Sequence, residues 1–293
     1  MHEREQVEFD VLNHRMTALV AHADEPRGVV LALHGGSSSK EYFDTAADPA
    51  LSLLRLGPAL GFTVVAPDRP GYGPDGFLLD TMPAGDRTDL LYATTDAALG
   101  GRSGGAGTFL VCHSMGCISG LRMAADPRGQ HLLGIEISGT GLTLDARAAA
   151  IHEGDEMRGR RGELRRLIWG PPELYPEWTR ESQRMAATPT SEGSDIREWA
   201  TELPELAAQV SVPVRYSLAE HESWWRSGEE ALDDVAALFT SAPFVETALE
   251  RGAGHNISLG FTARAYHLRV LAFAEECLVR AVARTARSPG STR

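Results

Sequence analysis

A serine stands between a predicted buried strand and a predicted helix. Residues 108–112 form a short apolar run, and residues 114–125 have the pattern of a helix. A tight strand-to-helix turn lifts the hydroxyl of a serine such as Ser114 out of the sheet, where it can attack a carbonyl carbon. The turn needs small residues two positions before and after the serine. Gly116 meets this need, whereas Cys112 occupies the position where glycine is usual. The pattern predicts that Ser114 is a nucleophile.

A histidine near the other end of the chain has the surroundings of a general base. His255 lies in the glycine-flanked loop G-A-G-H-N, after the last predicted strand and before the final predicted helix. Such a loop lets the imidazole reach the serine, and a histidine that follows the serine in the chain fits a hydrolytic triad. The helix that follows Ser114 also directs the backbone N–H of Met115 toward a developing oxyanion. Together these residues predict acyl transfer through a seryl intermediate.

Three other histidines lie near these motifs. His113 adjoins the nucleophile, but we expect its side chain to point away from Ser114 and to have a packing role. His34 is expected to pack within its own loop, and His221 is expected to be exposed. None of the three is therefore predicted to act as the base.

The elements that must position these residues alternate between strands and helices. Two short strands at residues 7–12 and 16–22 form a hairpin-like start, and the later strands are short apolar runs. We predict the later strands at residues 29–33, 63–66, 108–112, 133–138, 212–218 and 244–249. We predict helices at residues 51–60, 86–99, 114–125, 229–239 and 261–283. This alternation predicts an α/β fold, with a mostly parallel sheet covered by helices on both faces.

The alternation is interrupted between residues 143 and 210. This segment is rich in charged residues, holds Trp169, Trp178 and Trp199, and contains no apolar run that would make a buried strand. We predict that it forms helices and loops of a lid. The predicted organisation is therefore a core of residues 1–142 and 211–285, a helical lid of residues 143–210, and a flexible tail of residues 286–293.

Composition limits the classes of partner and the compartment. The chain has 293 residues and a net charge of −12, which disfavours binding to nucleic acid and to anionic membrane surfaces. Lys40 is the only lysine, a bias that we attribute to a GC-rich bacterial genome. The N-terminal residues lack the apolar segment of a signal peptide, and no stretch reaches the ~18 apolar residues of a membrane span. We therefore expect a cytoplasmic protein without a membrane partner; the sequence leaves its oligomeric state open.

Cysteines and glycine-rich segments give no sign of a cofactor. Cys112, Cys117 and Cys277 are too few and too poorly spaced for a disulfide framework or a zinc site. The glycines of residues 100–105 precede a predicted strand instead of following one, which is the wrong context for a phosphate-binding loop. We expect no metal, nucleotide or flavin.

Four motifs, in this order, resemble those of the α/β-hydrolase superfamily. They are L-H-G-G at residues 33–36, D-R-P-G-Y-G at 68–73, H-S-M-G at 113–116 and G-H at 254–255. The resemblance extends from about Val7 to Ala283 and implies an eight-stranded sheet with a helical lid inserted after the sixth strand. It also implies a Ser-acid-His triad. In the family, the loop after the third strand supplies an oxyanion N–H, which corresponds here to Gly36, with Ser37 as the neighbouring candidate.

The resemblance places the triad acid after the seventh strand, where family members commonly show Gly-x-x-Asp. Aligned in this way, Ala219 replaces the glycine and Glu222 replaces the aspartate. Glutamate can fill this role because the acid only orients the imidazole and stabilises its charge. Glu220 remains an alternative if the strand ends earlier, and Asp145 after the sixth strand is another.

A serine nucleophile narrows the reaction class. It argues against epoxide hydrolases and haloalkane dehalogenases, which use aspartate in this family. We predict a serine hydrolase that acts on an ester, thioester or lactone of a small to medium acyl substrate. Trp224, Trp225 and the three tryptophans of the predicted lid are candidates for lining an apolar pocket or for packing the lid on the core.

Two alternatives stay open. The first is an acyltransferase, a cyclase or an editing thioesterase of natural-product biosynthesis, which keeps the triad and changes the acceptor. The second is a ligand-binding protein without catalysis on the same fold. The sequence does not define the acyl-chain preference or the acceptor.

Overall fold

An eight-stranded sheet forms the centre of the molecule. The computed structural model describes residues 3–45, 48–152, 161–177, 179 and 186–287. The spatial strand order is β1-β2-β4-β3-β5-β6-β7-β8, and only the pairings of β2 with β1 and β4 are antiparallel. The strands are β1 (Arg4–Val11), β2 (His14–Ala21), β3 (Gly28–Leu33), β4 (Phe62–Pro67), β5 (Thr108–His113), β6 (Gly134–Ser138), β7 (Val214–His221) and β8 (Val245–Gly254). The predicted mostly parallel sheet and its opening hairpin are confirmed.

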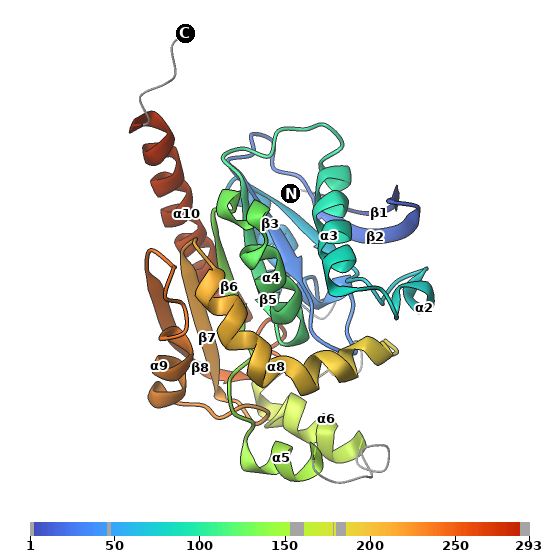
Figure 1. Ribbon diagram of the computed structural model, residues 1–293, viewed down its shortest axis with the longest axis vertical. Coiled ribbons are helices and arrows are strands. Elements are labelled where there is room, and N and C mark those ends of the chain that lie inside the picture. Colours follow the sequence, from blue (N-terminus) through green and yellow to red (C-terminus); the bar gives the residue numbers. More distant parts are fainter. Residues whose placement is uncertain (1–2, 46–47, 153–160, 178, 180–185, 288–293) are drawn as a thin grey trace.

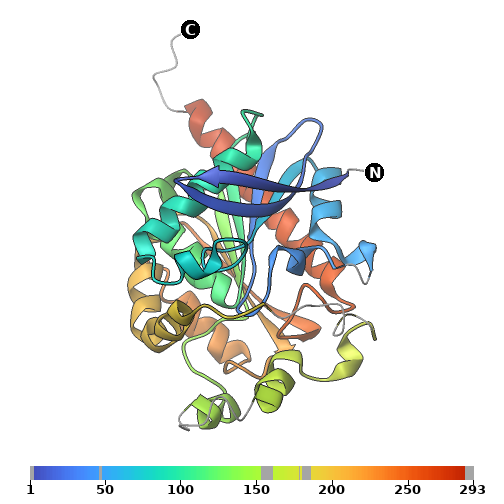
Figure 2. The same ribbon diagram turned by 90° about the vertical axis from the view of Figure 1, so that its right-hand side faces the viewer.

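Helices cover both faces of the sheet (Figures 1 and 2). On one face the apolar core combines alternate strand residues with α3 (Ala84–Leu99), α4 (Met115–Ala125) and α9 (Glu229–Ala236). The other face packs against α1 (Leu53–Ala59) and α10 (Ala263–Arg287). A short helix, α2 (Gly76–Leu79), lies in the connection between β4 and α3. The strands read as continuous apolar runs because they are buried from both sides.

The last strand is longer than predicted. The expected strand ended at residue 249, whereas β8 continues to Gly254. Its pairing with β7 extends to His221 opposite Gly254, past an irregularity in the register between Ala219 and His221. Backbone hydrogen bonds to β7 therefore continue through a glycine-rich stretch that has little intrinsic strand preference.

The described parts of the chain between β6 and β7 are mainly helical. It contains α5 (Ala146–His152), α6 (Arg161–Trp169), a short 3₁₀ helix, η4 (Pro172–Leu174), and α8 (Thr190–Gln209). Both views place α5 and α6 at one end of the molecule, while α8 crosses beside α4 (Figures 1 and 2). Trp199, Leu203 and Ala207 of α8 are buried in the core cluster that contains α4. The C-terminal half of α8 is thus part of the core, and the predicted division into core and lid stays a prediction. The predicted tail from residue 288 onward lies outside the described residues.

None of the helices in the described ranges has the length and apolar character needed to span a bilayer.

Candidate active site

Ser114 occupies a strained turn at the end of β5. Its backbone has φ 51° and ψ −122°, a conformation that L-residues adopt only where the surroundings impose it. Its N–H donates to the carbonyl of Ser138 on β6 (2.8 Å), and α4 begins at the next residue. A Cβ at Gly116 would overlap the carbonyl oxygen of Leu33 on β3, so glycine is required there. The turn therefore presents Ser114 at the carboxyl edge of the sheet.

Cys112 fits the position of the usual glycine because of a second glycine on α4. A Cβ added at Gly120 would overlap Sγ of Cys112 and would lie 3.3 Å from its Cβ. The missing side chain of Gly120 thus makes room for the thiol where β5 and α4 pack together. The departure from the usual motif is compensated one helical turn after Gly116.

His255 lies between Ser114 and a buried glutamate. Its Nε2 is 3.2 Å from Oγ of Ser114, and its Nδ1 is 2.9 and 3.0 Å from the two carboxylate oxygens of Glu222. Glu222 follows β7, and Oε1 also accepts the backbone N–H groups of Ser223 (3.0 Å) and Trp224 (2.8 Å). Strands β5, β7 and β8 all end at the same edge of the sheet, which brings these three side chains together.

Burial disfavours the charge on Glu222, but His255 and the two backbone N–H groups outweigh it and lower the pKa of this carboxyl group. The carboxylate therefore stays ionised and faces Nδ1 of His255. A proton on Nδ1 leaves Nε2 free to accept a proton from Ser114, which is the tautomer that a general base needs.

The alternative acids lie away from His255. Glu220 is exposed, and its Oε2 accepts the backbone N–H of Gly252 (2.7 Å). Asp145 binds the side chain of Arg147 (2.9 Å) at the start of α5. His221 is also exposed, as expected. Of the three candidate acids, Glu222 is the one that contacts His255.

Gly36 and Met115, the predicted oxyanion donors, lie against one another. A Cβ at Gly36 would lie 3.1 Å from Cγ of Met115, and a Cβ at Gly35 would lie 3.1 Å from Cβ of Ser114. The two glycines let the loop after β3 approach the serine closely, since a side chain at either position would crowd its neighbours. The N–H of Ser37, the neighbouring candidate, donates to the hydroxyl of Tyr72 (2.9 Å). Gly36 is thus the better placed of the two loop donors.

His113 and His34 are buried and form part of the frame of the site. The His113 ring stacks on Tyr42 at 4.7 Å, and its centroid is 5.0 Å from that of His255. Burial lowers the pKa of His113 well below its ordinary value, and the charge of His255 lowers it further. His34 accepts the backbone N–H of Arg69 at Nε2 (3.1 Å). Both rings therefore pack as neutral groups. His113 has the expected packing contact, with Tyr42, and it also lines the cavity at the serine.

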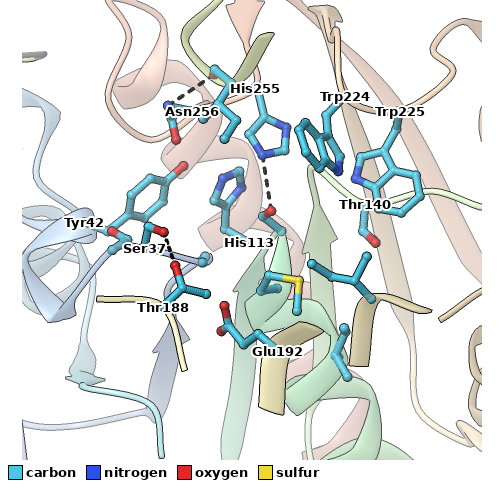
Figure 3. Close-up of a pocket in the computed structure, with 18 of the residues that line it drawn as sticks. Ser37, Tyr42, His113, Thr140, Thr188, Glu192, Trp224, Trp225, His255 and Asn256 are labelled. Atoms are coloured by element: carbon cyan, nitrogen blue, oxygen red, sulfur yellow. Dashed lines mark hydrogen bonds between the residues drawn. The ribbon is translucent and has the colours of Figure 1, made fainter. Parts of the chain in front are cut away.

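A cavity of about 230 Å³ opens at Ser114 (Figure 3). Its walls are mostly apolar, and Trp224 and Trp225 lie on the opposite side from Tyr42 in Figure 3. Trp199 also lines the cavity, whereas Trp169 packs on Tyr175. Three of the five tryptophans therefore line a pocket; Trp178 lies outside the described residues.

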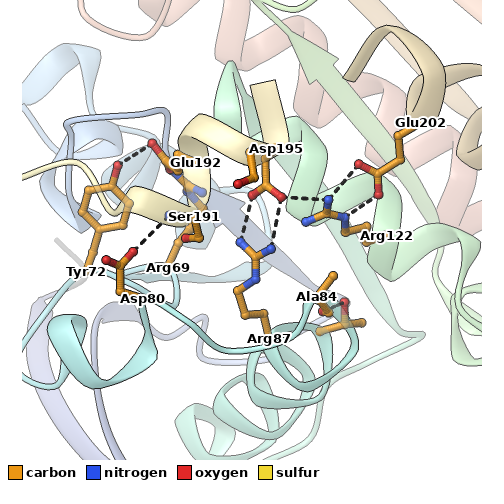
Figure 4. Close-up of polar contacts among 12 residues, drawn as sticks. Arg69, Tyr72, Asp80, Ala84, Arg87, Arg122, Ser191, Glu192, Asp195 and Glu202 are labelled. Atoms are coloured by element: carbon orange, nitrogen blue, oxygen red, sulfur yellow. Dashed lines mark hydrogen bonds and ion pairs between the residues drawn. The ribbon is translucent and has the colours of Figure 1, made fainter. Parts of the chain in front are cut away.

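The chain between β6 and β7 supplies one side of the cavity. Ile168 of α6, Thr188, and Glu192, Ile196 and Trp199 of α8 line it. Glu192 was not predicted from the sequence, where it lies within the segment assigned to the lid and has no role. In the structure it is buried and binds Arg69 and Tyr72 of the D-R-P-G-Y-G motif (Figure 4). The position of Glu192 depends on contacts with residues that are distant in the sequence, so no local sequence pattern could have identified it.

Among the described residues, no group of three or more His, Cys, Asp or Glu side chains is arranged to hold a metal ion.

A family model matches most of the chain. Residues 29–274 match the sequence model of the Alpha/beta hydrolase family. No curated protein sequence matches the chain significantly.

Solved structures share the fold at low sequence identity. A thermostable carboxyl esterase from Bacillus coagulans is 17% identical, with a TM-score of 0.64 over 95% of this chain and 100% of its own. The N-acyl homoserine lactonase AidH is 17% identical, with a TM-score of 0.65 over 94% and 98% of the two chains. AqDC, which cleaves the ring of the Pseudomonas quinolone signal, is 18% identical, with a TM-score of 0.69 over 93% and 99%. These likenesses establish the fold.

Proposed function

The chain belongs to the alpha/beta hydrolase family, and we propose that it is a serine hydrolase that cleaves an ester, a thioester or a lactone of a small to medium-sized substrate. One observation carries the proposal. Nε2 of His255 is 3.2 Å from Oγ of Ser114, while its Nδ1 contacts both oxygens of the buried Glu222. A packing or binding role alone does not require a strained serine aligned with a histidine and a buried carboxylate.

In the first half of the reaction, Ser114 attacks the carbonyl carbon of the substrate while Nε2 of His255 takes the hydroxyl proton. Glu222 remains ionised and stabilises the imidazolium that forms. The negative charge that develops on the carbonyl oxygen is received by the backbone N–H groups of Gly36 and Met115. Each such donor contributes roughly 3 kcal/mol to transition-state stabilisation. The imidazolium then protonates the leaving alcohol or thiol, and the acyl group stays on Ser114.

In the second half, His255 takes a proton from a water molecule, which attacks the acyl carbon. The tetrahedral intermediate uses the same two N–H groups. Its collapse returns the proton to Ser114 and releases the carboxylic acid. A lactone follows the same steps, except that its leaving alcohol remains part of the product.

The cavity supports a compact, mainly apolar acyl group. Its tryptophans offer flat apolar surface beside His255 (Figure 3), and its volume of about 230 Å³ suits a small to medium group. The helical segment between β6 and β7 forms one wall, so we propose that it acts as the lid that encloses this group. The carboxyl esterase and lactonase among the similar structures act on substrates of the same chemical class.

The test compares the wild type with Ser114→Ala. Ser114→Ala is expected to lose turnover of nitrophenyl butyrate by about 10⁴-fold or more and to lose labelling by a fluorophosphonate, because the attacking oxygen is removed. Labelling that persists in Ser114→Ala, located to another residue by mass spectrometry, would overturn the proposal. Incubation with a carrier-bound acyl thioester, with the products resolved by mass, distinguishes water from another acceptor.

A further inference from the structure

Two side chains of the D-R-P-G-Y-G motif help His34 to hold the loop that carries Gly36. The carbonyl of Gly35 accepts from Nδ1 of His34 (2.8 Å) and from Nη2 of Arg69 (3.2 Å). The hydroxyl of Tyr72 accepts the N–H of Ser37 (2.9 Å). A peptide group is planar, so a fixed Gly35 carbonyl also fixes the Gly36 N–H on the other side of the same bond. The bond from Ser37 fixes the following peptide group. Both peptide groups that flank Gly36 are therefore held by Arg69 and Tyr72.

Both of these side chains bind one carboxylate of the inserted segment. Oε1 of Glu192 accepts from the same Nη2 of Arg69, and Oε2 accepts from the hydroxyl of Tyr72 (2.9 Å; Figure 4). A Cβ at Gly36 would lie 3.0 Å from Oε2 of Glu192, so the carboxylate also abuts the loop directly. Glu192 thus joins the first turn of α8 to the loop after β3 by way of two residues.

These bonds lie in the interior, where they are strong and directional. The exposed fractions are 2% for Glu192 and 4% for both Arg69 and Tyr72. Burial opposes the charge on Arg69, but Glu192 outweighs it and raises the pKa of the guanidinium. Burial also raises the pKa of Tyr72, so its hydroxyl stays protonated and donates to Glu192. A charge-assisted network at low local dielectric is stiff, which suits the positioning of a backbone donor.

We propose that Glu192 is a positioning residue that, through Arg69 and Tyr72, orients the oxyanion donor of Gly36. The inference rests on the proposed hydrolase function, and it adds a role for the inserted segment in the chemistry itself. Glu192 does not touch the reacting atoms. Its loss leaves the triad in place and misdirects the Gly36 N–H, so transition-state stabilisation falls while ground-state binding changes little.

The same helix offers a control for simple attachment of α8. Asp195 binds Arg87 of α3 and Arg122 of α4, and Glu202 binds Arg122 through both oxygens (2.7 Å each; Figure 4). These ion pairs fasten α8 to the core at a distance from the loop after β3. Glu202→Gln weakens one of them and leaves the bonds of Glu192 intact.

The experiment measures kcat and KM on nitrophenyl butyrate, and the rate of fluorophosphonate labelling, for Tyr72→Phe, Glu192→Ala, Glu192→Gln and Glu202→Gln. We expect kcat to fall about 10- to 100-fold in Tyr72→Phe and Glu192→Ala, with KM within about threefold. The labelling rate falls in parallel, because the phosphonyl oxygen uses the same donors. Glu192→Gln keeps an acceptor oxygen and loses less than Glu192→Ala. Glu202→Gln stays within about twofold of the wild type.

Two results would overturn the inference alone. One is a kcat within twofold of the wild type in both Tyr72→Phe and Glu192→Ala, folded as judged by circular dichroism and thermal unfolding. The other is an equal loss in Glu202→Gln, which would mean that attachment of α8 is what matters. Ser114→Ala is run alongside. If Ser114→Ala retains labelling, both the proposed function and the inference are wrong. If Ser114→Ala loses labelling while the other variants match the wild type, only the proposed role of Glu192 is wrong.

Discussion

The two walls of the cavity at Ser114 are built by different means. The wall from the sheet consists of loops that follow strands, and backbone geometry sets it: Ser114 has a positive φ, and glycines at 35, 36 and 116 allow close approach. The wall from α6 and α8 consists of side chains on helices, such as Ile196, held by packing and ion pairs. Backbone geometry changes little when side chains are exchanged. We therefore expect the sheet side to determine the reaction and the helical side to determine the range of substrates, apart from the carboxylate of Glu192.

A substitution in the sheet wall should cause the largest loss of kcat. His255→Ala is expected to reduce kcat by about 10⁴-fold or more on nitrophenyl butyrate, because Ser114 then lacks a base. His221→Ala is the matched control, since His221 is exposed and lies near the same loops. A loss of less than tenfold in His255→Ala, or an equal loss in the control, would break the assignment of the chemistry to this wall.

Substitutions can distinguish Glu222 from Glu220 as the acid of the triad. Glu222→Gln is expected to reduce kcat by about 10³- to 10⁴-fold, because a neutral amide neither fixes the required tautomer of His255 nor stabilises the imidazolium. Glu220→Gln keeps an acceptor for the N–H of Gly252 and should remain within twofold. Steady-state kinetics of the two variants decides between them, and the reverse order would place the acid at Glu220.

Glu222 should also affect how the free energy of unfolding changes at acidic pH. The pKa of Glu222 is lowered in the folded protein, relative to about 4.3 in an unfolded chain. Its charge thus contributes stability that is present above the unfolded pKa and lost as the pH falls through the folded pKa. The wild type should lose more unfolding free energy than Glu222→Gln when the pH falls below about 4, measured by urea denaturation. Equal losses in the two proteins would contradict the lowered pKa.

A smaller effect tests the turn that presents Ser114. Gly120→Ala is expected to destabilise the protein by about 1–3 kcal/mol, because the new methyl group overlaps Sγ of Cys112. Cys112→Ala/Gly120→Ala removes the sulfur and should regain part of that loss. Urea denaturation of both variants, with Cys112→Ala as the reference, measures the coupling. Strictly additive effects would show that the two residues do not compensate one another.

A substitution in the helical wall should have the smallest effect, and it should change only the preference for acyl-chain length. Ile196→Ala enlarges the cavity, so the ratio of kcat/KM for octanoyl over butyryl nitrophenyl esters is expected to rise by about tenfold. Turnover of the acetyl ester should stay within about threefold. Glu198→Ala, an exposed position on the same helix, serves as the control. An unchanged chain-length ratio in Ile196→Ala would show that α8 does not contact the acyl group.

Much of the sheet wall could be predicted from local patterns. Apolar runs of five or six residues mark strands buried on both faces, and the residues that follow such strands meet at one edge. The positions of Ser114 and His255 after strands were therefore readable in advance. The acid was harder, because Glu220 and Glu222 both lie at the end of β7, and the choice depends on where the backbone turns.

The helical wall was not predictable in the same way. Its helices were expected, but the helix pattern of α8 says nothing about which carboxylate meets Arg69. Three acidic residues of this helix bind arginines: Glu192 binds Arg69, Asp195 binds Arg87 and Arg122, and Glu202 binds Arg122. These pairs join residues more than 70 positions apart, and they depend on how α8 packs against the rest of the molecule.

The sequence by itself was enough to predict the α/β fold, the candidate nucleophile Ser114 and base His255, and the class of acyl chemistry that is proposed for them. It could do so because hydrophobic periodicity and glycine positions are local constraints that each residue carries with it. The tertiary structure added three contacts that the sequence left open: the carboxylate of Glu222 against Nδ1 of His255, the space beside Gly120 that admits Cys112, and the hydrogen bond of Glu192 to Tyr72 of the loop that follows β4. Each of these depends on distances across the chain, which exist only after the sheet and the inserted helices have packed together.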